Sequence, residues 1–419
     1  LSNSARSKQF LKVLRDQNGN HISMVQRVYS QICKVDATID ITIATSSVQA
    51  DSLSMQIPSQ YSLVTEPERR DTAPAIMLAC ANLLLEQGAS DDDPVVVMPI
   101  DTFADQAYYD KIPQLAKAIT ASNKDLILLG VEPTYPSEKY GYILPAESEK
   151  DGVKDVLSFR EKPDAKTAKE YISANALWNC GVFGFKLRFL HETIEKYYVP
   201  SNYEDMLSHY GLFPKTSFDY EIVEKAKRIG VISYSGTWKD LGTWNTLTDE
   251  MDAAVSGEAS VDWNTCNNVH VINETSLPMV IAGLSDSVVV ATQDGILVSG
   301  KEESAHIKEL VSSAARDCPM VESSSWGRYS VLDSHQSVGQ SKGEIKRIQV
   351  KQSESIDCAS LANVYSCLVV ADGTGYLETD TREIELHPGV SFVYDRDTNY
   401  KINAISDLDL VCVEIKQTV

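Results

Sequence analysis

Three features of the sequence predict an α/β fold for its first part. Apolar runs are short enough for strands, amphipathic stretches lie between them, and the two alternate repeatedly. Alternating strands and helices form a mostly parallel sheet covered on both faces, and such sheets bind ligands beyond the carboxyl ends of their strands. The expected strands are Ile39–Thr45, Val95–Met98, Leu126–Val131, Val156–Phe159, Gly181–Phe185 and Val231–Tyr234.

Helices are expected between these strands, because apolar residues recur there at every third or fourth position. This spacing predicts helices over Ala73–Gln87, Ala107–Ala121 and Ala165–Ser173. Asp164 precedes the third of them and is suited to cap its first turn.

After Glu250 the sequence predicts mainly β structure, with one helix over Ser304–Ala315. We therefore expect an α/β domain at residues 1–250, a β-rich linker region at 251–315 and a β-sandwich or small barrel at 316–419. The expected strands are Val269–Ile272, Met279–Ala282, Ser287–Ala291, Ile296–Val298, Ile345–Val350, Ser366–Ala371, Gly375–Glu378, Glu383–Leu386, Val390–Tyr394, Tyr400–Ile402 and Leu408–Ile415.

The composition excludes some partners. The 419 residues carry a formal net charge of −21, whereas nucleic acids and anionic lipids are bound mainly through Lys and Arg, so we expect neither as a partner. Apolar runs all stay well below the roughly 18 residues of a membrane helix, so we expect no membrane span. The eight cysteines stand far apart, which favours reduced thiols in the cytoplasm over disulfides or zinc sites.

Two acids are candidate metal ligands. Asp101 follows the Val95–Met98 strand directly, where a carboxylate can hold a divalent metal over a crevice, although a turn or a helix cap is the commoner use of one such Asp. Asp240 stands beside Gly242, which would allow a ligand to approach closely; a turn flanked by buried Trp is the alternative. Only tertiary structure can bring the two together.

Cationic and polar residues at strand ends are candidates for binding a sugar phosphate. Arg6 and Lys8 suit phosphate binding, and a solvated surface is the alternative. Glu161 and Lys162 end a strand and could bind sugar hydroxyls and a phosphate, or form an exposed ion pair. Carbohydrate sites often place polar groups and Gly beside aromatic residues, as do core packing and turns; two stretches have this pattern, Tyr140-Gly141-Tyr142-Ile143 and Trp178-Asn179-Cys180-Gly181.

Taken in order, these stretches resemble the mannose-1-phosphate guanylyltransferases, or GDP-mannose pyrophosphorylases, in the long bacterial form related to the bifunctional phosphomannose isomerase/guanylyltransferases. The resemblance runs through residues 1–250 and more loosely to the carboxyl terminus. The matching stretches are Lys8-Gln9-Phe10, Glu66-Pro67, Asp71-Thr72-Ala73-Pro74-Ala75-Ile76, Val97-Met98-Pro99-Ile100-Asp101, Tyr140-Gly141-Tyr142-Ile143, Glu161-Lys162-Pro163, Trp178-Asn179-Cys180-Gly181, Asp219-Tyr220 and Trp238-Lys239-Asp240-Leu241-Gly242.

The resemblance implies a Rossmann-like nucleotidyltransferase (GT-A-like) fold with a cupin-like C-terminal β-sandwich. It also implies the reaction of GTP with mannose 1-phosphate to give GDP-mannose and diphosphate, by in-line transfer that depends on Mg²⁺. No covalent nucleophile is needed, and we see no convincing Ser–His or Cys–His arrangement in the sequence.

The same resemblance implies roles for individual residues, and it leaves open whether the protein is a homodimer. Asp101 and Asp240 would hold Mg²⁺, Lys8 would contact phosphate, and Lys162 would contact the phosphate of the sugar substrate. The residues implied to bind the sugar or the nucleotide are Gly141, the Tyr142 region, Glu161 and Asn179 for the sugar, with Thr72 and Ala73 beside the nucleotide.

The sequence departs from the family pattern near its start and around Asp101. The family has a strand and a glycine-rich G-x-G-x-R-L-W-P loop before its Lys-Gln segment, and we expect such a loop in the native protein although the sequence begins at Leu1. Ser7 replaces a Pro, and Ile100 and Thr102 replace the usual Ser and His, while the acid itself is kept.

The C-terminal part departs further. Trp326-Gly327 with Tyr329 resembles the entry to the cupin-like isomerase domain, whose metal is held by an H-x-x-R-x-E-H cluster. The corresponding stretch Cys358–Tyr365 has neither His nor Glu, and Tyr400 stands where a later His is expected. We therefore expect a cupin-like domain without isomerase chemistry, which packs against the catalytic domain or a second subunit.

Two alternatives stay open on the sequence alone. A regulatory homologue could bind a nucleotide sugar without turnover, which the altered neighbours of Asp101 favour modestly and the retained Asp101, Lys162 and Asp240 oppose. The same chemistry could also act on another sugar 1-phosphate or base, because one polar contact can set preference.

Overall fold

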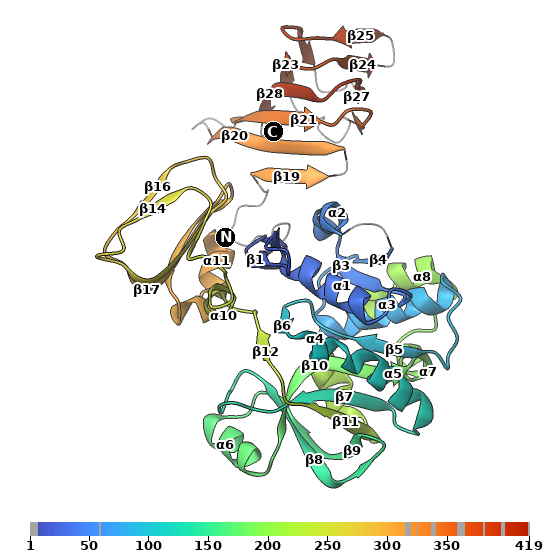
Figure 1. Ribbon diagram of the computed structural model, residues 1–419. Coiled ribbons are helices and arrows are strands. Elements are labelled where there is room, and N and C mark those ends of the chain that lie inside the picture. Colours follow the sequence, from blue (N-terminus) through green and yellow to red (C-terminus); the bar gives the residue numbers. More distant parts are fainter. Residues whose placement is uncertain are drawn as a thin grey trace. The chain divides into compact units, whose positions relative to one another are not determined.

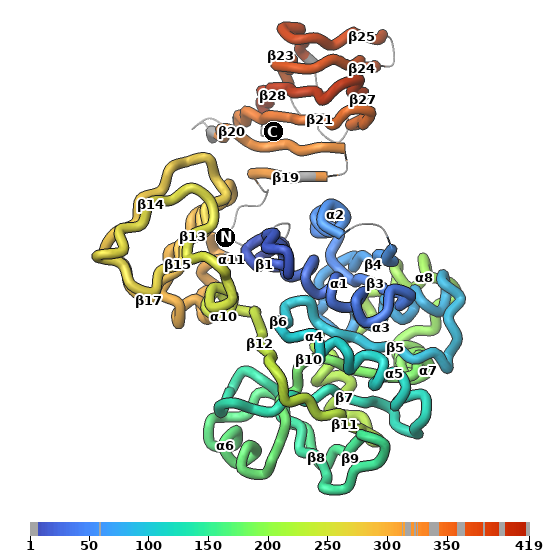
Figure 2. Tube along the Cα trace, viewed as in Figure 1, coloured from blue at the N-terminus to red at the C-terminus, as the bar shows by residue number. Residues whose placement is uncertain are grey.

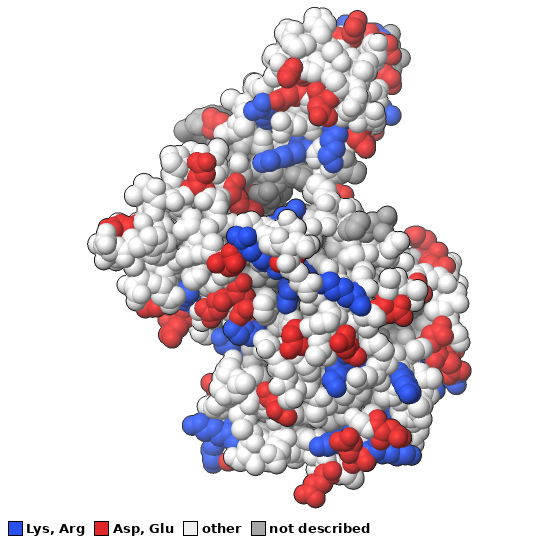
Figure 3. All heavy atoms as spheres, in the orientation of Figure 1, with Lys and Arg blue, Asp and Glu red and all other residues white. Residues whose placement is uncertain are grey.

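The computed structural model describes residues 7–57, 60–314, 320–324, 326–336, 341–357, 365–379, 382–394 and 399–417. The chain forms two compact units, the first spanning Lys8–Ala253 and the second beginning at Ala254 (Figure 1). None of the helices in these ranges has the length and apolar character needed to cross a bilayer. Acidic and basic side chains are interspersed on the face of the first unit shown in Figure 3.

The first unit is built on a six-stranded sheet with the order β5-β10-β7-β11-β9-β8. Three smaller sheets each pair two strands: β1 with β2, β3 with β4, and β6 with β12. The strands of this unit are β1 (Leu14–Arg15), β2 (His21–Ile22), β3 (Thr42–Ser46), β4 (Ser62–Glu66), β5 (Pro94–Val97), β6 (Thr102–Ala104), β7 (Leu126–Val131), β8 (Gly141–Lys150), β9 (Val153–Arg160), β10 (Leu177–Lys186), β11 (Ile229–Tyr234) and β12 (Trp238–Asp240).

The expected α/β class is confirmed, but the expectation of a mostly parallel sheet is wrong. Within the six-stranded sheet β7 and β11 are parallel, while β10 runs antiparallel to β5, β7 and β8, and β9 antiparallel to β8 and β11. A tight turn at Asp151 and Gly152, both with positive φ, joins β8 to β9, and a hairpin must reverse the chain. Residues 141–186 thus hold three strands and one helix, which interrupts the alternation that predicts parallel pairing.

Helices cover both faces of this sheet because successive apolar side chains of its strands point to opposite faces, and both sets need to be buried. Leu126 and Leu128 of β7 pack in one core with residues of α3 and α7, whereas Ile127 and Leu129 pack in another with α5. The α-helices are α1 (Met24–Val35), α2 (Ser47–Gln56), α3 (Thr72–Leu85), α4 (Gln106–Tyr109), α5 (Lys111–Ala121), α6 (Ala165–Ser173), α7 (Leu187–Glu195), α8 (Tyr203–Ser208), α9 (Phe218–Glu221) and α10 (Trp244–Thr248), with short 3₁₀ turns at Lys8–Phe10, Tyr210–Leu212 and Val223–Lys225.

Helix ends follow their local sequence. The α6 helix has the predicted bounds, and the Asp164 side chain accepts a hydrogen bond from Thr167 N at 2.8 Å, as a cap should. The single helix predicted over 107–121 is divided at Asp110 into α4 and α5. Pro113 lies in the first turn of α5, where its missing N–H is tolerated, so it favours a new helix start over continuation of α4.

The second unit contains short strands that pair mostly in parallel. Strand β15 pairs in parallel with both β13 and β17, and β14 pairs in parallel with β16, so these short strands stack around a small core. The elements are β13 (Val255–Ser256), β14 (Ala259–Val261), β15 (Asn267–Asn273), β16 (Met279–Ile281), β17 (Ser285–Thr292), β18 (Gly295–Gly300), a 3₁₀ turn at Glu303–Ala305 and α11 (Lys308–Ala314).

The C-terminal part is the expected β-sandwich. Two antiparallel sheets, with orders β19-β20-β21-β28-β23-β26 and β22-β27-β24-β25, pack face to face, since Leu368 and Leu410 of one share a core with Leu377 and Ile402 of the other. The strands are β19 (Val321–Ser324), β20 (Gly327–Gln336), β21 (Ser341–Val350), β22 (Ser355–Asp357), β23 (Tyr365–Asp372), β24 (Gly375–Thr379), β25 (Glu383–Leu386), β26 (Ser391–Tyr394), β27 (Tyr400–Ala404) and β28 (Leu408–Gln417).

Some residues named from the sequence lie outside the described ranges. These are Arg6 near the chain start and residues 358–364, which make up nearly all of the stretch expected at the isomerase metal site.

Candidate active site

The pairing of β6 with β12 brings Asp101 and Asp240 together. The two strands are antiparallel, with Asp240 opposite Thr102, the residue after Asp101 (Figure 2). The backbone N–H of Leu241 donates to the carbonyl oxygen of Asp101 at 2.8 Å, which ties the two segments at that point. The carboxylates named as metal ligands from the sequence are therefore neighbours in the fold.

Lys8 completes this cluster of charges. Burial and, next, repulsion by Asp240 raise the pKa of Asp101, while Lys8 opposes both effects. Burial lowers the pKa of Lys8, and the charges of Asp101 and Asp240 act in the opposite direction. Two carboxylates and one ammonium thus lie within electrostatic reach of one another, close to the end of β5.

The chemistry of this cluster fits a hard divalent cation. Gly242 N donates to Oδ1 of Asp240 at 2.5 Å, and a Cβ at Gly242 would lie 2.6 Å from that oxygen, so only glycine allows this orientation of the acid. In the described ranges no group of three or more His, Cys, Asp or Glu side chains converges on one point. Proteins often bind Mg²⁺ through one or two carboxylates, while phosphate groups of the substrate supply further ligands.

A second polar cluster lies where β8, β9 and β10 meet. Gly141 is paired with Asn179 across β8 and β10, and Glu161 directly follows β9. A Cβ at Gly141 would come within 3.0 Å of Oε2 of Glu161, so the carboxylate lies directly over the glycine. Three residues predicted to bind the sugar therefore converge, and glycine at 141 provides the space for Glu161.

Glu161 is the buried acid of this cluster. Its side chain is 8% exposed, Oε1 lies 3.3 Å from Nζ of Lys162, and Oε2 has no hydrogen-bond partner among the residues that the structure describes. Burial and then the charge of Asp219 raise the pKa of Glu161 to about 7, while Lys162 opposes the shift. A buried oxygen without a partner costs free energy, and a ligand hydroxyl could supply the hydrogen bond.

Lys162 has a strained backbone and an accessible side chain. Its φ of 44° lies in the left-handed region, which is costly for a residue with a side chain. Pro163 follows at once and disfavours the ordinary helical conformation for Lys162. The ammonium is 56% exposed, so it lies at the open edge of the cluster beside the buried Glu161.

Asp219 also belongs to this cluster, although the predicted site residues did not include it. Its Oδ1 accepts a hydrogen bond from Nδ2 of Asn179 at 2.6 Å, while Oδ1 of Asn179 accepts one from Gly181 N at 3.1 Å. Burial raises the pKa of Asp219, against the hydrogen bond from Asn179 and the charge of Lys162. In the sequence its signal was the Asp219-Tyr220 match to the family.

The two clusters lie side by side. The β10 strand is irregular between Asn179 and Phe183, where Gly181 has a φ of 74° and a Cβ would lie 3.4 Å from the Pro99 side chain. Pro99 is two residues before Asp101. Gly181 supplies the positive φ at this irregularity, and the segment that carries Asn179 runs close to the segment that carries the first metal-ligand candidate.

Aromatic residues form a wall beside both clusters. The Tyr140 ring lies 5.1 Å from the Trp178 ring and 5.3 Å from the Trp238 ring, both edge-on. Burial raises the pKa of Tyr140, and Tyr135, Asp240 and Asp101 add to this shift. The ring of Tyr140 is therefore held by aromatic packing within electrostatic reach of the carboxylate pair.

Thr72 and Ala73 support the site from α3. The hydroxyl of Thr72 accepts a hydrogen bond from Phe218 N at 2.8 Å, and Ala73 N donates to the carbonyl oxygen of Thr216 at 3.2 Å. Both contacts hold the short α9 turn on which Asp219 stands. The nucleotide contact expected for these two residues stays a prediction.

The Tyr142 side chain does not face the site, which corrects its expected contact with the sugar. Tyr142 is fully buried, and its hydroxyl donates to the carbonyl oxygen of Ser137 at 3.1 Å and accepts from Ser137 N at 2.9 Å. Successive side chains of a strand point to opposite faces, so when Gly141 faces Glu161, Tyr142 faces the core.

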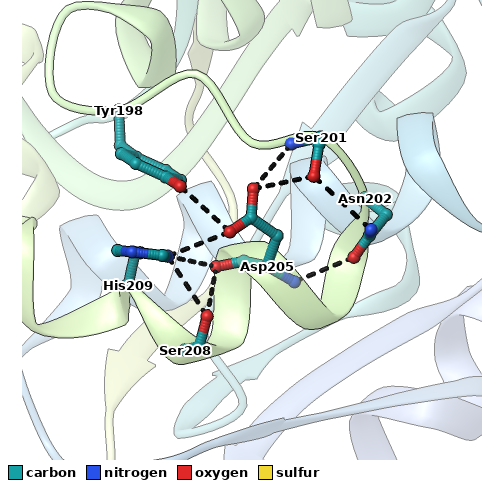
Figure 4. Close-up of polar contacts among 6 residues, drawn as sticks. All are labelled: Tyr198, Ser201, Asn202, Asp205, Ser208 and His209. Carbon is teal, nitrogen blue, oxygen red and sulfur yellow. Dashed lines mark hydrogen bonds and ion pairs between the residues drawn. The ribbon is translucent and has the colours of Figure 1, made fainter.

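A Ser–His–Asp group on and beside α8 has the wrong geometry for nucleophilic catalysis (Figure 4). Nδ1 of His209 lies 3.0 Å from Oδ1 of Asp205, 2.9 Å from its carbonyl oxygen and 3.1 Å from the hydroxyl of Ser208. A catalytic triad needs its serine and its acid at opposite ring nitrogens. The group, with Tyr198 and Ser201 also bonded to Asp205, instead stabilises the ends of a short helix.

With the fold and the site established, the chain belongs to the nucleotidyl transferase family, which it matches over residues 2–256. The family resemblance seen in the sequence motifs is thereby confirmed, and the chain is a nucleotidyltransferase enzyme.

Particular relatives extend the likeness over almost the whole chain. Xanthan biosynthesis protein XanB of Xanthomonas campestris pv. campestris (strain B100) is 27% identical over 447 residues, covering 99% of this chain and 92% of XanB. Mannose-1-phosphate guanylyltransferase of Escherichia coli is 27% identical over 424 residues, covering 92% of this chain and 88% of the relative. The crystal structure named mannose-1-phosphate geranyltransferase, from Thermus thermophilus, gives a TM-score of 0.59 at 26% identity, covering 75% of this chain and 94% of that one.

Proposed function

We propose that the protein transfers the guanylyl group of GTP to mannose 1-phosphate, giving GDP-mannose and diphosphate. The observation that carries the proposal is the closeness of the Gly181 and Pro99 segments, where a Cβ at Gly181 would lie 3.4 Å from the Pro99 side chain, since it sets a hydroxyl-binding cluster beside a pair of carboxylates that fits a cation. A sugar and a nucleoside triphosphate would meet between the two clusters. The names of the E. coli and Thermus relatives support the sugar, and the E. coli name supports the base.

The nucleotide phosphates are assigned to the cluster of Lys8, Asp101 and Asp240. A bound Mg²⁺, held by Asp101 and Asp240, would supply neutralisation of the phosphate charge. Lys8, half-buried and within electrostatic reach of both acids, would bind a phosphate oxygen directly. Thr72 and Ala73 are proposed to border the nucleotide.

The sugar phosphate is assigned to the cluster of Gly141, Glu161, Lys162 and Asn179. Oε2 of Glu161, buried and without a protein partner among the described residues, would bond to a ring hydroxyl. The Asn179 amide would bind another hydroxyl, and the accessible ammonium of Lys162 would bind the sugar phosphate. We propose that Gly141 contributes space and backbone in place of the buried Tyr142 side chain.

In this arrangement the chain positions the reactants and contributes no covalent nucleophile. A phosphate oxygen of mannose 1-phosphate attacks the α-phosphorus of GTP, the new O–P bond forms, and the bond to the leaving diphosphate breaks with its electron pair. Lys162 would orient the attacking phosphate, while Lys8 would stabilise charge on the nucleotide phosphates. The aromatic wall of Tyr140, Trp178 and Trp238 would exclude water.

Location and assembly are proposed on less direct grounds. We propose that the protein acts in the cytoplasm, because the six cysteines in the described ranges are free thiols, four of them buried. A homodimer remains a prediction.

The proposal is tested by diphosphate release from the full chain with Mg²⁺, across a panel of nucleoside triphosphates and sugar 1-phosphates. We expect release to be fastest with GTP and mannose 1-phosphate and to require both. Fastest release with another pair would reassign the substrates, and no release with any pair would remove the enzymatic proposal in favour of binding without turnover.

A further inference from the structure

We propose that Asp219 is a positioning residue of the sugar subsite, which fixes the side-chain amide of Asn179 and places a second, half-buried carboxyl group within electrostatic reach of Glu161. The inference rests on the proposed function for the identity of its ligand. Its structural basis, a buried polar network on α9, β9 and β10, is independent of which sugar is bound.

Asp219 has little freedom to move. It stands on the single turn of α9, whose first residue, Phe218, is buried, with its ring centre 4.8 Å from that of the tilted Phe183 ring. Phe218 N donates to Thr72 Oγ1 at 2.8 Å, and Ser217 caps the turn by accepting from Tyr220 N. Packing and two hydrogen bonds therefore hold the backbone of Asp219 against the start of α3.

From this fixed position Asp219 determines which way Asn179 points. Nδ2 of Asn179 donates to Oδ1 of Asp219 at 2.6 Å, and Oδ1 of Asn179 accepts from Gly181 N at 3.1 Å. An amide nitrogen has two N–H groups, and no second acceptor for Asn179 is present in the described part of the chain. One N–H thus stays available for a ligand oxygen, in a direction that the first hydrogen bond fixes.

Asp219 also acts on Glu161 through its charge. Among the charged groups that face Glu161, Asp219 and Glu224 favour its protonated form and Lys162 favours its ionised form. Asp219 is itself faced by Lys162 and by Asp71. Three acids and one lysine around one subsite suit a ligand rich in hydroxyl donors, with a single anionic group placed at Lys162.

These contacts assign a different role to each residue of the proposed sugar subsite. Asn179 and Glu161 would touch the sugar, whereas Asp219 acts through them. Thr72, which the sequence placed beside the nucleotide, holds the turn that carries Asp219. Loss of Asp219 should therefore weaken sugar binding while nucleotide binding stays the same.

The test compares Asp219→Ala, Asp219→Asn, Asn179→Ala and the double variant Asp219→Ala/Asn179→Ala in the full chain. Asp219→Ala should raise the KM for mannose 1-phosphate about tenfold, as expected for a lost charge-assisted hydrogen bond, with the KM for GTP changed by less than about twofold. Asp219→Asn keeps an acceptor for Asn179 and should restore part of the loss. The double variant should lose less than the sum of the two single losses, because part of the effect of Asp219 passes through that amide.

Glu221→Gln serves as the matched control, because Glu221 lies on the same turn but bonds to Lys225 and Tyr197. It should leave both KM values unchanged, and all variants should keep their far-UV circular dichroism. An unchanged KM for mannose 1-phosphate in Asp219→Ala, or losses that simply add in the double variant, would overturn the proposal.

A measurement without turnover separates this proposal from the proposed reaction. In protein labelled with ¹³C at the glutamate carboxyl groups, the signal that disappears in Glu161→Gln reports the titration of Glu161. Asp219→Asn should shift this titration to lower pH, because it removes the neighbouring negative charge. An unshifted titration would overturn the proposal even in an active enzyme, and a shifted one would support it even if GTP and mannose 1-phosphate were not the substrates.

Discussion

The N–H of Leu241 donates to the carbonyl oxygen of Asp101 at 2.8 Å, and this bond sets Asp240 beside Asp101 although the two acids are far apart in the sequence. It extends the pairing of β6 with β12, two strands of only three residues each. The like charges of the acids are partly balanced by Lys8, which leaves the cluster suited to a further cation.

Asp101→Asn and Asp240→Asn should each reduce diphosphate release by about a hundredfold or more, because each neutralises one proposed cation ligand. Neither variant should lower the thermal unfolding midpoint by more than a few degrees, since each change removes repulsion between the pair. Asp105→Ala provides the contrast, because Asp105 caps α4 and accepts a hydrogen bond from the Tyr234 hydroxyl at 2.7 Å. It should lower stability by about 1 kcal/mol and leave the rate nearly unchanged. Wild-type rates in either variant of the pair would contradict the assignment.

Gly141→Ala should raise the KM for mannose 1-phosphate about tenfold, because the new Cβ would displace the Glu161 carboxylate from its place over the glycine. The KM for GTP should stay the same. Gly184→Ala is the control in the neighbouring strand, where a Cβ would meet its closest atoms at 3.6 Å, an ordinary contact. Equal effects of the two substitutions on the sugar KM would show that the space at Gly141 does not serve the ligand.

The stability of the free protein should depend on pH through Glu161. Burial and the charge of Asp219 raise the pKa of this carboxyl from 4.5 to about 7, so the folded state binds its proton more tightly than the unfolded state. Stability is then lost as pH rises from about 4.5 to about 7, by at most about 3 kcal/mol. In urea unfolding, the free energy of unfolding of wild type should fall relative to that of Glu161→Gln between about pH 4.5 and about pH 7.

Glu221→Gln should show the opposite trend. Hydrogen bonds from Lys225 and Tyr197 outweigh burial and lower the pKa of Glu221, so its stabilisation is present above the ordinary pKa and lost as pH falls. For the Glu161 prediction, free energies of unfolding that change with pH in the same way in wild type and in Glu161→Gln would show that Glu161 has an ordinary pKa, which would contradict the prediction.

The C-terminal sandwich contains a buried ion network that should be costly to break. Nζ of Lys346 lies 2.7 Å from Glu414 and 3.3 Å from Glu344, and none of the three side chains is more than 10% exposed. Lys346→Met removes the ammonium from between two buried carboxylates and should destabilise the sandwich by about 3–5 kcal/mol in denaturant unfolding. Arg347→Met, which breaks the exposed pair with Asp409, should cost about 1 kcal/mol or less. A similar cost for both would mean that the network is solvated.

The purified protein should not interconvert fructose 6-phosphate and mannose 6-phosphate, with or without added Zn²⁺. Isomerisation of this kind uses a metal held by several convergent ligands. Residues 316–419 contain two histidines, and one of them, His387, is exposed and contacts the neighbouring Pro388 carbonyl. Isomerase activity that disappears on chelation would contradict this prediction.

Local patterns predicted the elements well where the pattern is strong. The bounds of β7 and α6 follow directly from an apolar run and from a capped amphipathic stretch. The direction of the strands was not predictable in the same way, because β8 was not recognised as a strand. Its recognition would also have indicated that Tyr142 faces away from the site, since Gly141 and Tyr142 alternate on one strand.

The candidate site was harder to predict from the sequence than the helices and strands, because its residues come together only in the tertiary structure. Asp101, Asp240, Glu161 and Asn179 were named as candidates from their local setting, and the family resemblance implied their roles; the structure brings them into two adjacent clusters. For Asp219 the sequence offered only the Asp219-Tyr220 match and no role, because its partner Asn179 lies on β10 and is reached only through the packing of α9 on α3.

The most direct test of the account follows the α-phosphorus of GTP. The full chain, incubated with mannose 1-phosphate, Mg²⁺ and GTP labelled at the α-phosphorus, should place the label in GDP-mannose and release one diphosphate for each molecule formed. Asp101→Asn should fold and show almost none of this transfer. Label that stays in GTP, from protein that demonstrably binds both GTP and mannose 1-phosphate, would contradict the account.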